Sequence, residues 1–219
     1  MEPTPLIPLF PLAIVALPGQ PVSLHIFEER YKTMVIDCSP GRTDAPFAPF
    51  GICLQLGSDV EKVGCTAVVT EITERYADGS FDIVTRADRR YTTVRTFEDR
   101  PYLTGEVEYF DDIEGGGTEP GLRDQVEARH LELLDLAARE AGVGEAAARP
   151  DETEEPPDSF AMAARVAMAL RQKQRLLELR SETERLEHLA TYLDQALPQY
   201  RERVERKHRA KGNGHSKEL

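Results

Sequence analysis

The spacing of apolar residues changes once along the chain, near residue 113, and this change constrains the fold more than any other feature. From Leu6 to Tyr109, short runs rich in Val, Ile, Thr, Tyr and Phe alternate with turn residues, as is typical of β-strands. After residue 113, apolar residues recur every three or four positions, which is the spacing of amphipathic helices. The sequence therefore predicts an α+β protein in which a mostly antiparallel sheet, curled or closed, precedes a helical region.

The segment Phe10–Tyr31, FPLAIVALPGQPVSLHIFEERY, contains two apolar runs separated by a Pro-Gly pair. Proline followed by glycine favours a type II turn, because glycine adopts a positive φ at little cost. We therefore expect two antiparallel or neighbouring strands on either side of Pro18-Gly19. The next residues, FEERYKTMVIDC, predict a short amphipathic helix with one apolar face, made of Phe27, Tyr31, Met34, Val35 and Cys38.

Four further segments predict strands, which brings the expected number to about six. Asp78-Gly79 lies between two of them and predicts a tight hairpin turn with positive φ angles. The four segments are FGICLQLG, GCTAVVTEITERY, SFDIVTRADRRYTTVRTF and YLTGEVEYF.

Three segments in the second half predict helices. The first ends at Gly142, the second is capped by Asp158 or Ser159, and the third begins at Ser181, which has capping-box spacing to Glu184. Their sequences are LRDQVEARHLELLDLAAREAG, FAMAARVAMALRQKQRLLEL and ETERLEHLATYLDQAL.

These patterns together predict three parts of the chain. We expect a β-rich subdomain over residues 1–113 and a helical subdomain over residues 114–198. An acidic, proline-rich linker is expected near residues 143–158. Residues 199–219 are expected to form a charged, partly disordered tail.

The formal charge of −12 is unevenly distributed, with −7 over residues 1–111, −10 over 112–160 and +5 over 161–219. An acidic surface repels phosphate backbones, so nucleic-acid binding is not expected from the first 160 residues. The basic tail is a candidate contact for nucleic acid or an acidic partner, although a solvated helix end is the commoner explanation.

Three cysteines with no Cys-x-x-Cys motif are interpreted as small buried side chains in a reducing compartment. The N-terminus lacks the basic region of a signal peptide, and no apolar run approaches the roughly 20 residues that cross a bilayer. These features predict a soluble, cytoplasmic protein with no membrane contact.

No motif for catalysis or cofactor binding is evident. The sequence has no Gly-x-Ser-x-Gly motif, and its glycine-rich segment EGGGTEPG lacks the lysine of a phosphate-binding loop. Its five histidines are scattered, and none has the spacing to another histidine or a cysteine that zinc sites typically require. We therefore expect no enzyme activity, no catalytic residue, no cofactor and no metal.

Two pairs of residues remain as candidates for binding. Arg89 and Arg90 in a predicted strand either bind an anion or pair with carboxylates, and the acidic surroundings favour pairing. The proline-rich loop that bears Phe47 and Phe50 is a candidate contact for a peptide, with local core packing of the two rings as the favoured alternative.

Several motifs, taken in order, resemble the N-terminal domain of Lon proteases. The opening segment matches its Phe-Pro-Leu, Pro-Gly and Leu-x-Ile-Phe-Glu-x-Arg-Tyr elements, and FGICL, VGCTAVVTEI, DGSFDIV, RRY and KQRLLEL follow in the family order. Ala87 stands where the family often has glycine, and Cys65 stands where it usually has threonine. With 219 residues there is no room for the ATPase and peptidase modules, so the chain looks like a stand-alone Lon-type substrate-binding domain.

This resemblance implies a PUA-like β pseudo-barrel, with about six strands and a short helix, followed by a C-terminal helical bundle. It also implies a non-catalytic module that binds unfolded or peptide segments of other proteins, as an adaptor or a specificity factor for a protease. RNA binding is the alternative, because PUA-like folds also serve that role, but no strand face combines aromatic and basic residues. An enzyme of unrecognised type is a third alternative, and the sequence indicates neither a client nor an oligomeric state.

Overall fold

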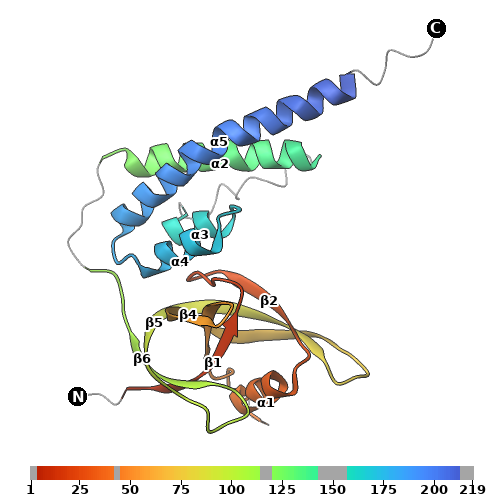
Figure 1. Ribbon diagram of the computed structural model, residues 1–219, viewed down its shortest axis with the longest axis vertical. Coiled ribbons are helices and arrows are strands. Elements are labelled where there is room, and N and C mark those ends of the chain that lie inside the picture. The colour runs from red at the N-terminus through yellow and green to blue at the C-terminus, as the bar shows by residue number, and fades with distance from the viewer. Residues whose placement is uncertain (1–3, 42–44, 114–119, 143–156, 213–219) are drawn as a thin grey trace. The chain divides into compact units, whose positions relative to one another are not determined.

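The structure is a computed structural model that describes residues 4–41, 45–113, 120–142 and 157–212 (Figure 1). The strands come first and most of the helices follow, so the predicted α+β architecture and the expected six strands are confirmed. None of the described helices is long and apolar enough to span a membrane. The elements in chain order are β1 Leu6–Leu12, β2 Pro21–Ile26, α1 Glu29–Cys38, β3 Phe50–Leu56, β4 Asp59–Arg75, β5 Phe81–Phe97, β6 Thr104–Tyr109, α2 Leu122–Ala141, α3 Ser159–Ala164, α4 Leu170–Glu178 and α5 Glu182–Gly212.

The chain forms two compact units. The first contains Met1–Asp112 and Ala169–Glu178, and the second contains Ile113–Met168 and Leu179–Leu219. Helix α4 thus belongs to the unit of the strands, whereas the sequence placed it in the helical subdomain. Most of the expected acidic linker and the last seven residues of the expected tail lie outside the described residues.

The single helix expected across α3 and α4 is wrong, because the chain leaves the helical conformation after Arg165. No glycine or proline marks this break, so helix propensity does not predict it. Beyond the break, Gln174 of α4 donates a hydrogen bond from Nε2 to the carbonyl oxygen of Val63 in β4, at 3.0 Å, which is a contact between distant segments.

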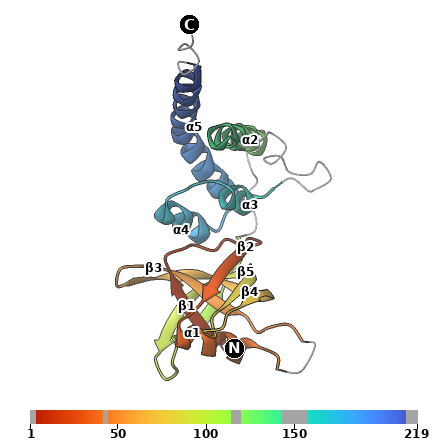
Figure 2. The same ribbon diagram turned by 90° about the vertical axis from the view of Figure 1, so that its right-hand side faces the viewer.

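Five of the strands close into a barrel in the order β5-β4-β3-β1-β6, because β6 pairs with both β1 and β5 (Figure 2). All strand pairs are antiparallel except β1 with β3. Strand β2 lies outside this circle and pairs with the N-terminal half of β5. The expected closed, mostly antiparallel sheet is therefore confirmed, and it is consistent with a PUA-like pseudo-barrel.

The two strands expected as neighbours around Pro18-Gly19 are not paired with each other. The turn itself is present, since Gln20 N donates to the Leu17 oxygen at 3.0 Å and Gly19 has a φ of 79°. After the turn, backbone hydrogen bonds join Gly19 and Gln20 to Ala87 in β5. These bonds direct β2 onto β5 rather than back onto β1.

Tyr91 of β5 is fully buried in the barrel, and two glycines make room for its ring. A Cβ at Gly51 of β3 would lie 2.7 Å from the ring carbon Cζ, and a Cβ at Gly64 of β4 would lie 2.5 Å from it. The Tyr91 hydroxyl donates to the Ile52 oxygen at 3.3 Å. The residues that pack with Tyr91 come from β1, β3 and β6: Ile7, Leu9, Cys53 and Val107.

Substitution of Gly64 by alanine should destabilise the barrel by about 1–3 kcal/mol, because the new methyl group overpacks the core. It would meet the backbone oxygen of Ile52 at 2.5 Å as well as the Tyr91 ring, so no flexible side chain can simply move away. Urea unfolding measures the loss, and Ser58→Ala at an exposed position is the control. Equal stability of Gly64→Ala and wild type would contradict this packing.

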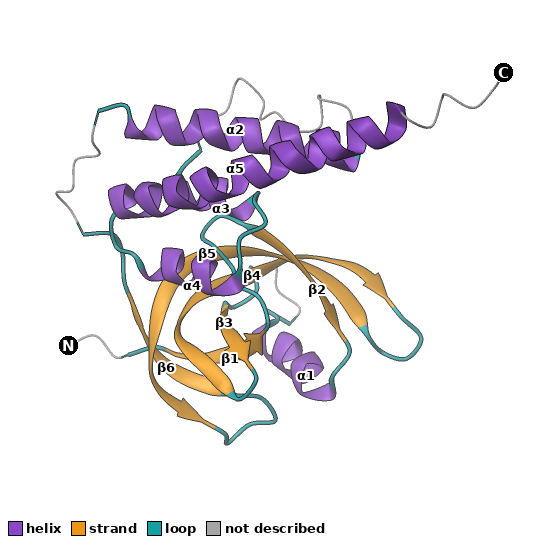
Figure 3. Cartoon of the chain, turned by 45° about the horizontal axis from the view of Figure 1, so that its top comes forward, coloured by secondary structure: helices purple, strands orange, loops and turns teal. Residues whose placement is uncertain are grey.

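In the second unit, α2 and α5 pack side by side (Figures 1 and 3). Buried leucines on α5 repeat at helical spacing, and the helix continues through Pro198 to Gly212. His130 of α2 is buried, and desolvation lowers its pKa to about 4, so its imidazole is neutral at pH 7. Asp158 caps α3 through a hydrogen bond from Ala161 N at 2.7 Å, as one of the two predicted caps.

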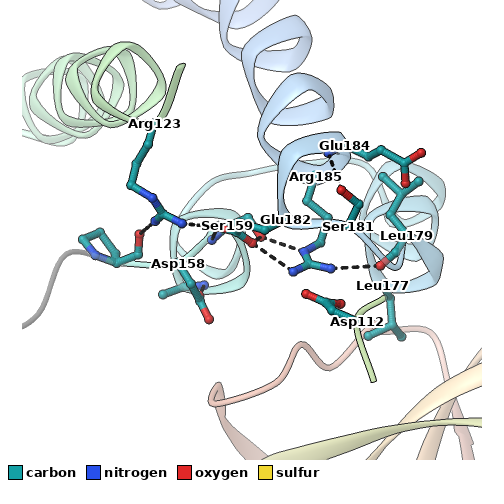
Figure 4. Close-up of polar contacts among 12 residues, drawn as sticks. Asp112, Arg123, Asp158, Ser159, Leu177, Leu179, Ser181, Glu182, Glu184 and Arg185 are labelled. Atoms are coloured by element: carbon teal, nitrogen blue, oxygen red, sulfur yellow. Dashed lines mark hydrogen bonds and ion pairs between the residues drawn. The ribbon is translucent and has the colours of Figure 1, made fainter. Parts of the chain in front are cut away.

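A buried polar network joins α2, α3 and α5 (Figure 4). The Glu182 carboxylate accepts hydrogen bonds from Arg123 at 2.8 Å, from the Ser159 hydroxyl at 2.6 Å and from Arg185 at 2.9 Å. Arg185 is itself buried, donates to the Ser159 hydroxyl and the Leu179 carbonyl, and lies over the Phe160 ring. This network holds the short helix α3 against the two long helices.

Replacing Glu182 by glutamine should destabilise this unit by about 2–4 kcal/mol, because it removes a carboxylate charge that faces both the buried Arg185 and Arg123. Glu187→Gln is the matched control, since Glu187 is exposed on the same helix. Helical circular dichroism followed during urea unfolding reports both variants. If they unfold at the same urea concentration, the network does not stabilise the unit.

Candidate functional site

A groove opens between α1 and the hairpin that joins β4 to β5, within the first compact unit, with a volume of about 420 Å³. One wall is formed by the helix and the residues that follow it, and the other by the two strands next to their turn. Five of the lining side chains are apolar: Val35, Ile36, Phe47, Ile72 and Phe81.

Helix α1 buries one apolar face against the barrel and leaves the apolar side chain of Ile36 exposed. The predicted helix is confirmed, and Tyr31, Met34, Val35 and Cys38 are buried as expected. Ile36 is 66% exposed and points away from that face. Sequence analysis missed Ile36, although an isoleucine outside the buried stripe of a short amphipathic helix is a detectable signal.

The hairpin turn is held close to α1 by Lys32. Its Nζ donates to the Glu29 carboxylate at 2.9 Å and to the Asp78 carbonyl oxygen at 3.5 Å. The predicted tight turn is confirmed, but Gly79 alone has a positive φ, of 81°, and its N–H donates to the Tyr76 oxygen. Hydrogen bonds from Ser80 to the Asp78 carboxylate lower its pKa and stiffen the turn.

Charged residues of both signs surround the apolar floor of the groove. Glu29 and Lys32 come from α1, and Arg75 and Asp78 come from the hairpin. The Arg75 guanidinium lies 5.7 Å from the centre of the Phe81 ring. An apolar floor with a mixed polar rim suits a polypeptide side chain better than a phosphate or another multiply charged anion.

The two phenylalanines singled out in the sequence have different environments. Phe47 is half-buried and lines the groove. Phe50 is the first residue of β3 and has 0% exposure, and its ring centre lies 6.1 Å from that of Phe10. Phe50 is therefore part of the hydrophobic core. Phe27 was expected in the buried face of the helix, but it precedes α1 and is 61% exposed, which corrects that assignment.

Arg89 and Arg90 of β5 both contact other residues of the first unit. Arg90 is buried, pairs with Asp112 at 2.5 Å, and donates to the Leu177 carbonyl of α4 at 3.3 Å. Pairing with a carboxylate is therefore confirmed for Arg90. Arg89 is exposed, and its guanidinium lies 4.3 Å from the centre of the Tyr109 ring.

The three cysteines are free and buried, as predicted. Burial raises the pKa of Cys38 to about 11 and the pKa values of Cys53 and Cys65 to about 12. A thiol with such a high pKa is almost entirely protonated at neutral pH, and the thiolate is the reactive form. Within the described residues no cluster of three or more His, Cys, Asp or Glu could hold a metal ion.

All three thiols should therefore resist alkylation by iodoacetamide at pH 8 in the folded protein and react fully in denaturant. Intact-mass spectrometry counts the adducts over time. The denatured sample is the control for reagent activity, and rapid labelling of any cysteine under native conditions would contradict the burial described above.

Comparison with known proteins agrees with this architecture. The model of the ATP-dependent protease La (LON) substrate-binding domain matches residues 6–195. The structure of a Lon N-terminal domain protein from Xanthomonas campestris is similar, with a TM-score of 0.62 and 26% identity, covering 86% of this chain and 98% of that one. The N-terminal domain of Mycobacterium avium complex Lon protease shares the fold, with a TM-score of 0.64 and 21% identity over 87% of this chain and 98% of that one. The chain therefore belongs to the LON substrate-binding domain family, which is a family of substrate-recognition modules.

Proposed function

We propose that this protein is a non-catalytic module that binds unfolded or peptide segments of other proteins, and that the groove between α1 and the β4–β5 turn takes up their apolar side chains. The observation that carries this proposal is the combination of a largely exposed Ile36 and a half-buried Phe47 on one open groove. An apolar surface of this kind is costly to leave in water unless it binds something.

The shape and the charge of the groove support a peptide ligand. Its volume of about 420 Å³ suits a few side chains rather than a folded domain. Family membership supports protein substrates as the ligand class. The net charge of −7 over residues 1–111 gives no support to RNA as an alternative.

A role as an adaptor or a specificity factor for a protease follows as part of the same proposal. A module that binds unfolded segments would present them to the protease that degrades them. We place this activity in the cytoplasm, where the three free, buried thiols would remain reduced.

Ile36→Ser should weaken binding of a permanently unfolded, cysteine-alkylated protein by about tenfold, because it removes an apolar contact worth about 1.4 kcal/mol. Ile36 is exposed, so the fold should be unchanged by circular dichroism. Val94→Ser is the matched control, since Val94 is 56% exposed in the same unit and does not line the groove. Fluorescence anisotropy with a labelled ligand measures both, and equal affinities of the two variants would reject the groove as the site.

A further inference from the structure

Beyond the closed barrel, three strand segments form an open extension of the sheet (Figure 3). In it β2 pairs with residues 81–86 of β5, which pair in turn with residues 68–75 of β4. On β4, only residues 59–67 pair with β3. Among the described strands, the extension thus has two edges without a neighbour, one on β2 and one on the C-terminal half of β4.

The edge on β4 is protected against pairing with another chain. Its register to β5 shifts between Val69 and Glu71 and again between Ile72 and Glu74. Bulges twist an edge strand, and charged side chains make its approach by another strand costly. Glu71, Glu74 and Arg75 provide such charges within this short segment.

The edge on β2 has neither form of protection. Its sequence PVSLHI contains no Asp, Glu, Lys or Arg, and its six residues pair with β5 in unbroken register from Pro21 to Ile26. Pro21 lacks an N–H and limits pairing only at the start of the strand. Ser23 and His25 are exposed. This edge is therefore regular, uncharged and accessible.

The pattern of hydrogen bonds between β2 and β5 shows which backbone groups of β2 point outward. Ala87 N donates to the Gln20 oxygen at 2.9 Å, so Gln20 faces β5. Because the direction of hydrogen bonding alternates along an antiparallel strand, Val22 and Leu24 also face β5, whereas Ser23 and His25 direct their N–H and C=O groups away from it. No described segment pairs with this edge.

Aromatic side chains lie beside β2. The His25 ring is 5.8 Å from the Phe27 ring and 5.6 Å from the Tyr76 ring. Asp82 holds two of them in place, accepting a hydrogen bond from the Tyr76 hydroxyl at 2.7 Å and lying 2.6 Å from His25 Nδ1. Phe27, which directly follows β2, is 61% exposed and offers contact area to an added strand, whereas Tyr76 follows β4 and lies on the β5 side of β2.

We propose that the free edge of β2 binds an extended, apolar segment of an unfolded polypeptide by adding it as a further strand. Ser23 and His25 supply backbone hydrogen bonds, and the exposed Phe27 contacts a side chain of the bound segment. This inference rests on the proposed function and deepens it, because it names the conformation of the substrate. Segments rich in β-branched and aromatic residues are the ones that unfolded chains expose and that pair readily in this way.

Ser23→Pro tests the inference, because proline removes the outward N–H of residue 23 and leaves the bonds between β2 and β5 in place. The probe is a labelled peptide of about ten residues with alternating valine and threonine. We expect at least a tenfold loss of affinity for Ser23→Pro and none for Ser23→Ala, which removes only the hydroxyl. Unchanged circular dichroism confirms that Ser23→Pro is folded.

A second measurement uses the wild-type protein, so it does not depend on how the variant folds. Binding of the peptide should slow hydrogen exchange at the Ser23 and His25 amides, and the same peptide N-methylated at alternate residues should not bind. Unchanged exchange at both amides in the presence of bound peptide overturns the inference. If exchange at these two amides slows when only the protein concentration is raised, without peptide, the inference is also overturned, since the edge would then pair with a second copy.

These outcomes are separable from the test of the groove. Suppose that the peptide binds the wild type, that Ile36→Ser weakens this binding and that Ser23→Pro does not. The proposed function then stands and strand addition is rejected. If neither the peptide nor the unfolded protein binds to the wild type, both proposals fail.

Discussion

The barrel depends on the close approach of the Tyr91 ring to two backbones that carry no side chain at Gly51 and Gly64. This contact lets β3, β4 and β5 lie around one buried ring, and residues of β1 and β6 complete the same cluster. Any larger residue at either glycine would push apart the strands whose pairing closes the circle. Both glycines lie in motifs of the family pattern, FGICL and VGCTAVVTEI, and the structure supplies their physical reason.

Closure of the barrel also determines where binding surfaces remain. The C-terminal half of β5 pairs with β6 and completes the barrel, so its N-terminal half extends outward with β2 and the end of β4. This extension carries both features proposed to bind polypeptide, the groove beside α1 and the free edge of β2. The two lie in one compact unit and share the start of β5, where Phe81 lines the groove and Asp82 pairs with His25 of β2.

Local chemistry was sufficient to predict much of the structure. The helix after Phe27, the turns at Gly19 and Gly79, the cap at Asp158 and the carboxylate pairing of Arg90 all rest on contacts between residues close in sequence or on general rules for burying charge. The break between α3 and α4 and the separation of β1 from β2 were not predictable in this way. Each accompanies contacts with residues far along the chain, Val63 for α4 and Ala87 for the residues before β2.

The sequence by itself determined the order of strands and helices, the turns and caps, and membership of a recognisable family, because these follow from residue spacing and from motifs. Only the tertiary structure decided which apolar residues stay in water. Phe50 is buried and Phe27 is exposed, although each is an aromatic residue at the start of a predicted element. That choice depends on which strand lies against each residue, and strand pairing is a contact between distant segments that no local pattern encodes.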